Sequence, residues 1–285
     1  MPEGPAPQVE RAVPMWMPPG SDQSVVADLW RPPTGVTSSG LAVIYINIGG
    51  WTITTPDVFV GTLFSHMTSQ GHVVLNLAPR RPIPDANLFD MEADINHAIA
   101  WMKQNADTYG VSPDRIVLSG GSAGAHLALL AAYVPDYADS TTDDLKGTDL
   151  SVRAVAVYYP VVDLRAFYRF GASKEMMQNL VGGLPDQMPA MYDLASPINY
   201  VRADLPPTII FQGAADRSVP VESSRLLHEK LRGEGVPSVY VEFPQTEHGF
   251  DITLPRFNPA AQASLYHLDR FLALMAGSQN FSQLQ

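Results

Sequence analysis

Short, largely apolar runs recur along the chain from residue 41 onward. The first covers residues 41–46 and ends just before Gly49 and Gly50, and the second covers residues 73–77. Runs of this kind are typical of strands that are buried on both faces of a parallel sheet. The segment 56–70 between them is long enough for a crossover helix, so the pattern predicts a βαβ unit.

A one-sided apolar stripe between residues 91 and 107 predicts an amphipathic helix, which Gly110 follows. Further strands are predicted over 115–119, 154–159, 208–212 and 238–243, and further helices over 125–134, 221–232 and 259–276. Strands that alternate with helices at this spacing predict an α/β fold, with a mostly parallel sheet covered by helices on both faces.

Two segments fall outside this alternation. The first 40 residues hold eight prolines by position 33, which predicts an arm with edge strands; only residues 24–30 have the composition of a strand. Residues 163–205 are rich in Phe, Tyr and Met. Structureless loops of that length are rare, so we expect a small inserted lid there, or else a helical excursion that packs on the sheet. Residues 1–285 are therefore expected to form one domain.

Composition narrows the classes of function. With 46% hydrophobic and 16% charged residues, the chain can bury a large core, and a formal charge of −11 disfavours a nucleic-acid partner. The chain has no cysteine, which excludes disulfides, thiolate metal sites and cysteine nucleophiles. Its first residues are proline-rich and acidic, and no apolar run is long enough for a bilayer. We expect no membrane association and a cytoplasmic location.

Ser122 is the candidate nucleophile. It lies in Gly120-Gly121-Ser122-Ala123-Gly124, between a predicted strand and a predicted helix. The glycines two residues to either side allow a sharp turn in which no Cβ collides with the strand or the helix. Such a turn lifts the hydroxyl out of the sheet, beside the free N–H groups of the helix N-terminus. A phosphate-binding loop is the structural alternative, but its Lys-Ser/Thr ending is missing.

A serine hydroxyl needs a base, and the base needs an acid that fixes its tautomer. His248 is the only one of seven histidines in a loop after the last predicted strand. The others fall on predicted helices or strand ends: His66, His72, His97, His126, His228 and His267. Asp216 follows the strand 208–212 and is the favoured acid, while Asp163 is the second candidate and is better suited to capping a helix. The order Ser122, Asp216, His248 is that of α/β-hydrolase triads.

An oxyanion intermediate also needs preplaced N–H donors. Ala123, next to the nucleophile, can offer one. The turn Gly49-Gly50-Trp51 can offer two more, from Gly49 and Gly50, because glycine lets the backbone approach a substrate closely.

From residue 41 to the C-terminus, the chain resembles α/β-hydrolases of the carboxylesterase type related to hormone-sensitive lipase and its bacterial esterase relatives. The family's His-Gly-Gly-Gly-Trp segment resembles residues 47–51, and its Tyr-Arg-Leu-Ala-Pro-Glu segment resembles residues 75–80. Its Gly-Asp-Ser-Ala-Gly-Gly segment resembles residues 120–125, and the acid motif and His-Gly-Phe are also in place. The resemblance implies the α/β-hydrolase fold.

Three departures from the family pattern bear on the site. Asn47 replaces the histidine, Ile48 replaces the first glycine, and Arg80 replaces the glutamate. We expect the amide of Asn47 to hold its loop, since it both donates and accepts hydrogen bonds. Ile48 is expected to reshape the loop or to narrow the acyl side of the site.

These features predict a serine hydrolase that cleaves carboxylic esters of small to medium apolar groups through an acyl-enzyme on Ser122. Ile48, Trp51 and Phe250 are expected to contact substrate, and no metal or cofactor is expected. A biosynthetic enzyme that uses the same triad for cyclisation, lactone opening or epimerisation is the alternative. A non-catalytic small-molecule receptor is a third hypothesis. The edge strand 238–243 and its following helix are expected to be able to pair in a homodimer.

Overall fold

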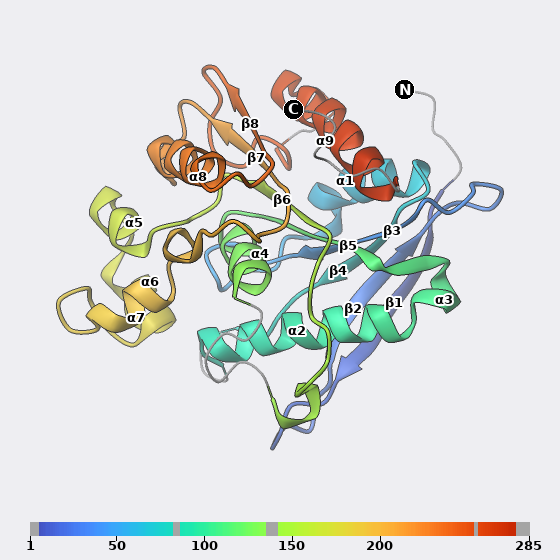
Figure 1. The fold of residues 1–285 in the computed structure, drawn as a ribbon, viewed down its shortest axis with the longest axis horizontal. Helices are drawn as coiled ribbons and strands as arrows, with labels where there is room; N and C mark the ends of the chain where they lie inside the picture. Colours follow the sequence, from blue (N-terminus) through green and yellow to red (C-terminus); the bar gives the residue numbers. More distant parts are fainter. Residues whose placement is uncertain (1–5, 82–85, 135–141, 254–255, 278–285) are drawn as a thin grey trace.

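Eight strands form one sheet in the described part of the chain, in the order β1-β2-β4-β3-β5-β6-β7-β8 (Figure 1). The computed structural model describes residues 6–81, 86–134, 142–253 and 256–277. The strands are β1 (Gln8–Trp16), β2 (Val25–Arg31), β3 (Gly40–Ile46), β4 (Val73–Leu77), β5 (Val111–Gly121), β6 (Ala154–Tyr158), β7 (Thr208–Gly213) and β8 (Ser238–Phe243). β1 and β2 pair antiparallel with their neighbours, and the strands from β4 to β8 are parallel.

Helices cover both faces of this sheet (Figure 1). The α-helices are α1 (Asp57–Ser69), α2 (Leu88–Gln104), α3 (Ala106–Tyr109), α4 (Ala123–Tyr133), α5 (Leu164–Phe170), α6 (Lys174–Val181), α7 (Pro189–Leu194), α8 (Val221–Gly233) and α9 (Pro259–Ala276). The 3-10 helices are η1 (Asp143–Leu145) and η2 (Pro197–Tyr200). α1 and α9 pack on one face, while α2, α4 and α8 pack on the other.

β3 illustrates why the central strands read as continuous apolar runs. Leu41, Val43 and Tyr45 point into the cluster beneath α1 and α9, whereas Ile44 and Ile46 point into the cluster beneath α2 and α4. Both faces of the strand are therefore buried, as in other parallel sheets with helices on either side. The mostly parallel sheet with helices on both faces is the predicted architecture.

The sequence predicts edge strands in the first 40 residues but does not place β1, since only residues 24–30 of that region have a strand-like composition. Pro14 lies within β1, opposite Val26, and the register shifts between Glu10 and Val13. β1 is the terminal strand of the sheet, where a missing N–H can face away from the ladder and proline is tolerated. Residues 1–5 of the predicted arm lie outside the described residues.

The segment 163–205 holds α5, α6, α7 and η2 between β6 and β7. In Figure 1, α5, α6 and α7 lie together beyond one end of the sheet. Within the residues that the structure describes, no helix has the length and apolar character needed to span a bilayer.

Candidate active site

Ser122 occupies a strained turn between β5 and α4. Its backbone has φ 55° and ψ −118°, a region that non-glycine residues rarely adopt, and such strain clusters at functional sites. The Ser122 N–H donates to Tyr158 O at 3.0 Å, which ties the turn to the end of β6. Since α4 begins at the next residue, the Ala123 N–H has no acceptor within the helix.

Gly120 and Gly124, two residues to either side of Ser122, lie so close to neighbouring backbone that a side chain would not fit at either position. A Cβ on Gly124 would lie 2.1 Å from Ile46 O, and a Cβ on Gly120 would lie 2.7 Å from the carbonyl carbon of Gly124. The turn is therefore wedged against the end of β3, and this contact requires glycine at both positions.

His248 and Asp216 form a hydrogen-bonded pair. The Nδ1 of His248 lies 2.8 Å from Oδ2 of Asp216, whose side chain is fully buried. A carboxylate only accepts, so Nδ1 carries the proton and Nε2 keeps its lone pair. The other carboxylate oxygen of Asp216 accepts the N–H groups of Ser218 and Val219, each at 2.8 Å. Burial raises the pKa of Asp216, but the bonds from His248, Val219 and Ser218 outweigh burial and hold this pKa below its usual value.

Gln212, which sequence reasoning missed, holds Asp216 and is itself held by Ser224. Gln212 donates from Nε2 to Oδ2 of Asp216 at 3.0 Å and accepts the hydroxyl of Ser224 at 2.8 Å. The segment that carries Asp216 also packs closely on the segment that carries His248, because a Cβ on Gly213 would lie 2.2 Å from Thr246 O. Gln212 follows apolar residues in β7 and carries no motif, so only the folded contact identifies it.

The competing acid and the other histidines are engaged elsewhere. Asp163 is the N-cap of α5, where its carboxylate accepts the Ala166 N–H at 2.9 Å, as predicted for a helix-capping residue. Five of the other histidines form hydrogen bonds away from Ser122: His66 with Asp269, His72 with Ser39, His97 with Asp144, His126 with Trp51 and Ala195, and His228 with Ser238.

The loop after β3 brings Gly50 beside Ser122. Asn47 holds this loop: its Nδ2 donates to Thr55 O at 3.0 Å, and its Oδ1 accepts the Thr55 N–H at 2.9 Å. The expectation that its amide would replace the family histidine as a loop anchor is confirmed. The Gly49 N–H donates to Ile53 O at 2.6 Å and is therefore occupied. Gly50 has φ 53°, and its N–H makes no hydrogen bond within the described residues.

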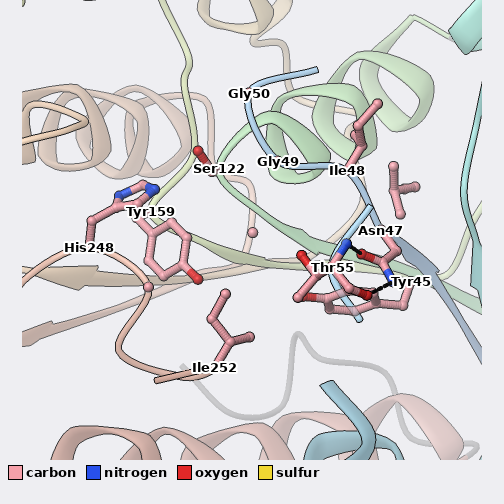
Figure 2. A pocket seen from close by; sticks show the side chains of 13 residues that line it. Tyr45, Asn47, Ile48, Gly49, Gly50, Thr55, Ser122, Tyr159, His248 and Ile252 are labelled. Carbon is pink, nitrogen blue, oxygen red and sulfur yellow. Dashed lines mark hydrogen bonds between the residues drawn. The ribbon is translucent and has the colours of Figure 1, made fainter. Parts of the chain in front are cut away.

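Ser122, His248 and Gly50 line a cavity of about 270 Å³. Figure 2 shows Ser122 and His248 toward one side of the cavity, and Asn47, Thr55 and Tyr45 toward the other. The ring of Tyr159 and the side chain of Ile252 lie between these two groups. Of the described residues that line the cavity, none belongs to the segment 163–205.

The three residues expected to contact substrate differ in position. Ile48 is among the lining residues, but it is only 3% exposed and belongs to the buried core cluster, so its narrowing of the acyl side stays a prediction. Trp51 and Phe250 are each only 2% exposed and are not among the lining residues. Trp51 packs against His126 and Phe167, and Phe250 packs against aromatic rings of the core. Trp51 and Phe250 therefore pack behind the residues that line the cavity.

Tyr159 and Asp251 are further residues that sequence reasoning missed. The Tyr159 ring centroid lies 4.2 Å from that of His248, and its hydroxyl donates to Oδ1 of Asp251. Tyr159 has φ 39°, a second strained non-glycine residue at this site. Burial raises the pKa of Asp251 to about 6, while the Tyr159 bond lowers it. The only sequence signal is the position of Asp251, three residues after His248.

Comparison with known sequences identifies relatives of this chain. The family model described as BD-FAE matches residues 27–231. Esterase LipQ of Mycobacterium tuberculosis is 32% identical over 246 residues, which are 82% of this chain and 56% of LipQ. Esterase LipC of the same organism is 29% identical over 264 residues, or 88% of this chain and 63% of LipC. The chain thus spans between about half and two thirds of the length of these curated relatives.

Two solved structures of esterase 2 from Thermogutta terrifontis are similar to this chain, and each match covers 98% of both chains. The propionate-bound form has a TM-score of 0.76 and 29% sequence identity. The form phosphorylated by paraoxon has a TM-score of 0.76 and 27% identity.

Proposed function

The chain belongs to the BD-FAE family and has the α/β-hydrolase fold, and on this basis we propose that it is a serine esterase. One observation carries the proposal: Ser122 and His248 line the same cavity, and His248 is hydrogen-bonded to the buried carboxylate of Asp216. The names of the relatives, esterase LipQ among them, support the same activity. So does the phosphorylation of esterase 2 from Thermogutta terrifontis by paraoxon.

In the proposed reaction, the Ser122 hydroxyl attacks the acyl carbon of the ester while Nε2 of His248 accepts its proton. The protonated imidazole then gives this proton to the leaving alcohol. Asp216 holds the imidazole through Nδ1 and stabilises its positive charge. Water, deprotonated by His248, attacks the acyl-enzyme on Ser122 and releases the acid, after which the serine recovers its proton.

The N–H groups of Gly50 and Ala123 are the proposed oxyanion donors. Both belong to backbone beside Ser122, and neither has an acceptor within the part of the chain that the structure describes. Gly49, which the sequence also suggests as a donor, gives its N–H to Ile53 O. We therefore assign the oxyanion two donors rather than three, with Gly49 holding the loop that presents Gly50.

The cavity supports a short, apolar acyl or alcohol group as the substrate part bound there. Its volume of about 270 Å³ falls below the range of roughly 300–1,000 Å³ that is common for ligand sites. The apolar and aromatic residues among those that line it are Tyr45, Ile46, Ile48, Tyr159 and Ile252. Esterase 2 of Thermogutta terrifontis, which was solved with propionate and with butyrate bound, is consistent with short acyl groups.

Hydrolysis of p-nitrophenyl esters from acetate to decanoate tests the proposal, with the Ser122→Ala variant measured beside the parent chain. The expected result is measurable turnover of the short esters by the parent. In the variant, kcat should fall by on the order of 10⁴-fold or more. A variant that hydrolyses these esters at the parental rate would contradict the proposal.

Labelling by a fluorophosphonate separates the two alternatives. If Ser122 is labelled while no ester in the series is turned over, the biosynthetic hypothesis replaces the esterase. If the fluorophosphonate labels no residue, the hypothesis of a non-catalytic receptor replaces the esterase. The anchoring of the loop by Asn47 favours the esterase, because the departure from the family motif leaves the Gly50 donor in place.

Assembly and location are also part of the proposal. β8 lies at the end of the sheet order, and no strand among the described residues pairs with its outer edge, which we propose as the surface that pairs with a second copy in a homodimer. Light scattering of the purified chain tests this assembly, and a monomer at all concentrations would contradict it. We further propose that the protein acts in the cytoplasm on a small-molecule ester, which fractionation of cells that express the native protein tests.

A further inference from the structure

His126 links three segments that lie far apart in the sequence. It stands one turn after Ser122 on α4, and its own backbone N–H donates to Ser122 O at 3.0 Å. Its ring lies 3.2 Å from Nε1 of Trp51, in the loop that carries Gly50, and 2.8 Å from Ala195 O, in the segment 163–205. The nucleophile helix, the oxyanion loop and the insertion therefore meet at one imidazole.

The directions of these hydrogen bonds follow from the chemistry of the partners. Ala195 O only accepts, so Nε2 of His126 carries the proton. Its Nδ1 then has a free lone pair, which accepts the indole N–H of Trp51, a group that only donates. His126 is fully buried, and burial lowers its pKa to about 4, while the bond to Ala195 raises it. The imidazole is accordingly neutral near pH 7, as both bonds require.

Trp51 makes this contact from a strained backbone conformation. It follows Gly50 directly and has φ 59°, in the left-handed region that a bulky side chain rarely adopts. Its ring stands edge-on to that of His126, at 84° and with centroids 5.4 Å apart. Because Trp51 directly follows Gly50, a change in the backbone conformation of Trp51 would shift the part of the loop that presents the Gly50 N–H to the cavity.

We propose that His126 is a positioning residue of the active site: by accepting the indole N–H of Trp51, it holds the Gly50 N–H where the oxyanion forms. This inference rests on the proposed esterase function and adds to it a residue that does not touch the substrate. The bond to Ala195 O has a different role. It keeps the imidazole in the tautomer that can accept from Trp51, and it ties the segment 163–205 to α4.

Two conservative variants separate the two bonds. In His126→Asn, the amide oxygen takes the place of Nδ1 and can still accept from Trp51, whereas the bond to Ala195 is lost. In His126→Gln, the amide nitrogen takes the place of Nε2 and can still donate to Ala195, whereas the acceptor for Trp51 is lost. Trp51→Phe removes the indole N–H and keeps an aromatic ring. His72→Gln is the matched control, since His72 is a buried histidine bonded to Ser39, outside the cavity lining.

The experiment measures kcat and KM for p-nitrophenyl butyrate, with thermal unfolding recorded for each variant. His126→Gln and Trp51→Phe should each lower kcat by about 10- to 100-fold and leave KM within about twofold, because an oxyanion donor acts in the transition state. His126→Asn should keep kcat within about threefold of the parent, and His72→Gln should leave kcat unchanged. The double variant of Trp51→Phe and His126→Gln should be no slower than either single variant.

Equal kcat values for His126→Asn and His126→Gln would overturn the inference, and so would a double variant whose losses multiply. Parental kcat in Trp51→Phe would do the same. None of these outcomes touches the proposed function, which fails only if Ser122→Ala remains active.

Discussion

The hydroxyl of Tyr159 donates a hydrogen bond to the carboxylate of Asp251, three residues after His248 in the same loop. The loop that carries the proposed base is thereby fixed at two points, since His248 itself bonds to Asp216. Both carboxylates are buried, but their pKa values are shifted in opposite directions. His248 and two N–H groups hold the pKa of Asp216 below its usual value, whereas burial raises the pKa of Asp251 to about 6.

Tyr159→Phe tests the anchoring role of this bond. The variant keeps the ring beside His248 and removes only the hydroxyl. We expect kcat for short esters to fall by about 3- to 30-fold, because His248 is held less tightly. The free energy of unfolding should fall by about 1–3 kcal/mol, because Asp251 loses its partner. Steady-state kinetics and urea unfolding give the two numbers; parental values for both would show that the bond anchors nothing.

Asp251→Asn tests the charge state of the buried carboxyl. The native pKa is raised, so the carboxyl favours the folded state when protonated, and this contribution is lost as the pH rises from about 4 to about 6. An asparagine can still accept from Tyr159 and never ionises. The variant should gain stability relative to the parent over this pH range, by on the order of 2–3 kcal/mol at pH 7. A difference in unfolding free energy that does not change with pH would contradict this account.

His72→Gln tests the opposite case. Burial lowers the pKa of His72 to about 4, so the unfolded chain binds one more proton than the folded chain between about pH 6.5 and pH 4. The free energy of unfolding therefore falls as the pH falls through this range. Replacing His72 should reduce that slope by up to about 1.4 kcal/mol per pH unit. Urea unfolding at several pH values measures the slope, and an unchanged slope would show that His72 takes up its proton equally in the folded and the unfolded chain.

Asp216→Asn tests the proposed acid against its rival. An asparagine amide facing Nδ1 favours the tautomer with the proton on Nε2, which removes the base. We expect kcat to fall by on the order of 10³–10⁴-fold. Asp163→Asn is the matched control and should leave kcat near the parental value, since Asp163 caps α5. The reverse result would assign the acid to Asp163.

Gly124→Ala tests the packing of the nucleophile turn. The added methyl group would lie 2.1 Å from Ile46 O, so α4 or β3 must move. We expect a loss of about 3 kcal/mol or more of unfolding free energy, together with loss of activity. Gly233→Ala is the control, because a Cβ there meets nothing within 4 Å. Circular dichroism and thermal unfolding of both variants check the contrast, which equal stabilities would contradict.

The sequence predicts well those features that depend on local pattern. Strands such as Ser238–Phe243 and helices such as Pro259–Ala276 coincide with the predicted ranges, because apolar period and flanking turn residues are local signals. The turn at Ser122 is predicted for the same reason, since the glycines that it requires lie within five consecutive residues, 120–124.

The remaining features depend on contacts between distant segments. Gln212, Tyr159 and His126 act through partners that only the folded chain brings to them. The occupied N–H of Gly49 depends on a bridge to Ile53 that no local pattern specifies. The position of β1 is not predicted because it contains Pro14, and proline is tolerated there only because β1 is the terminal strand of the sheet, which the composition does not reveal.

The central claim, that Ser122 is the nucleophile of an esterase, is tested most directly by titrating the activity on p-nitrophenyl butyrate with a fluorophosphonate and mapping the adduct by mass spectrometry. The account predicts that activity falls in proportion to labelling and vanishes at one adduct per chain, on Ser122. Full activity in a fully labelled protein, or an adduct on another residue such as Ser119, would contradict it.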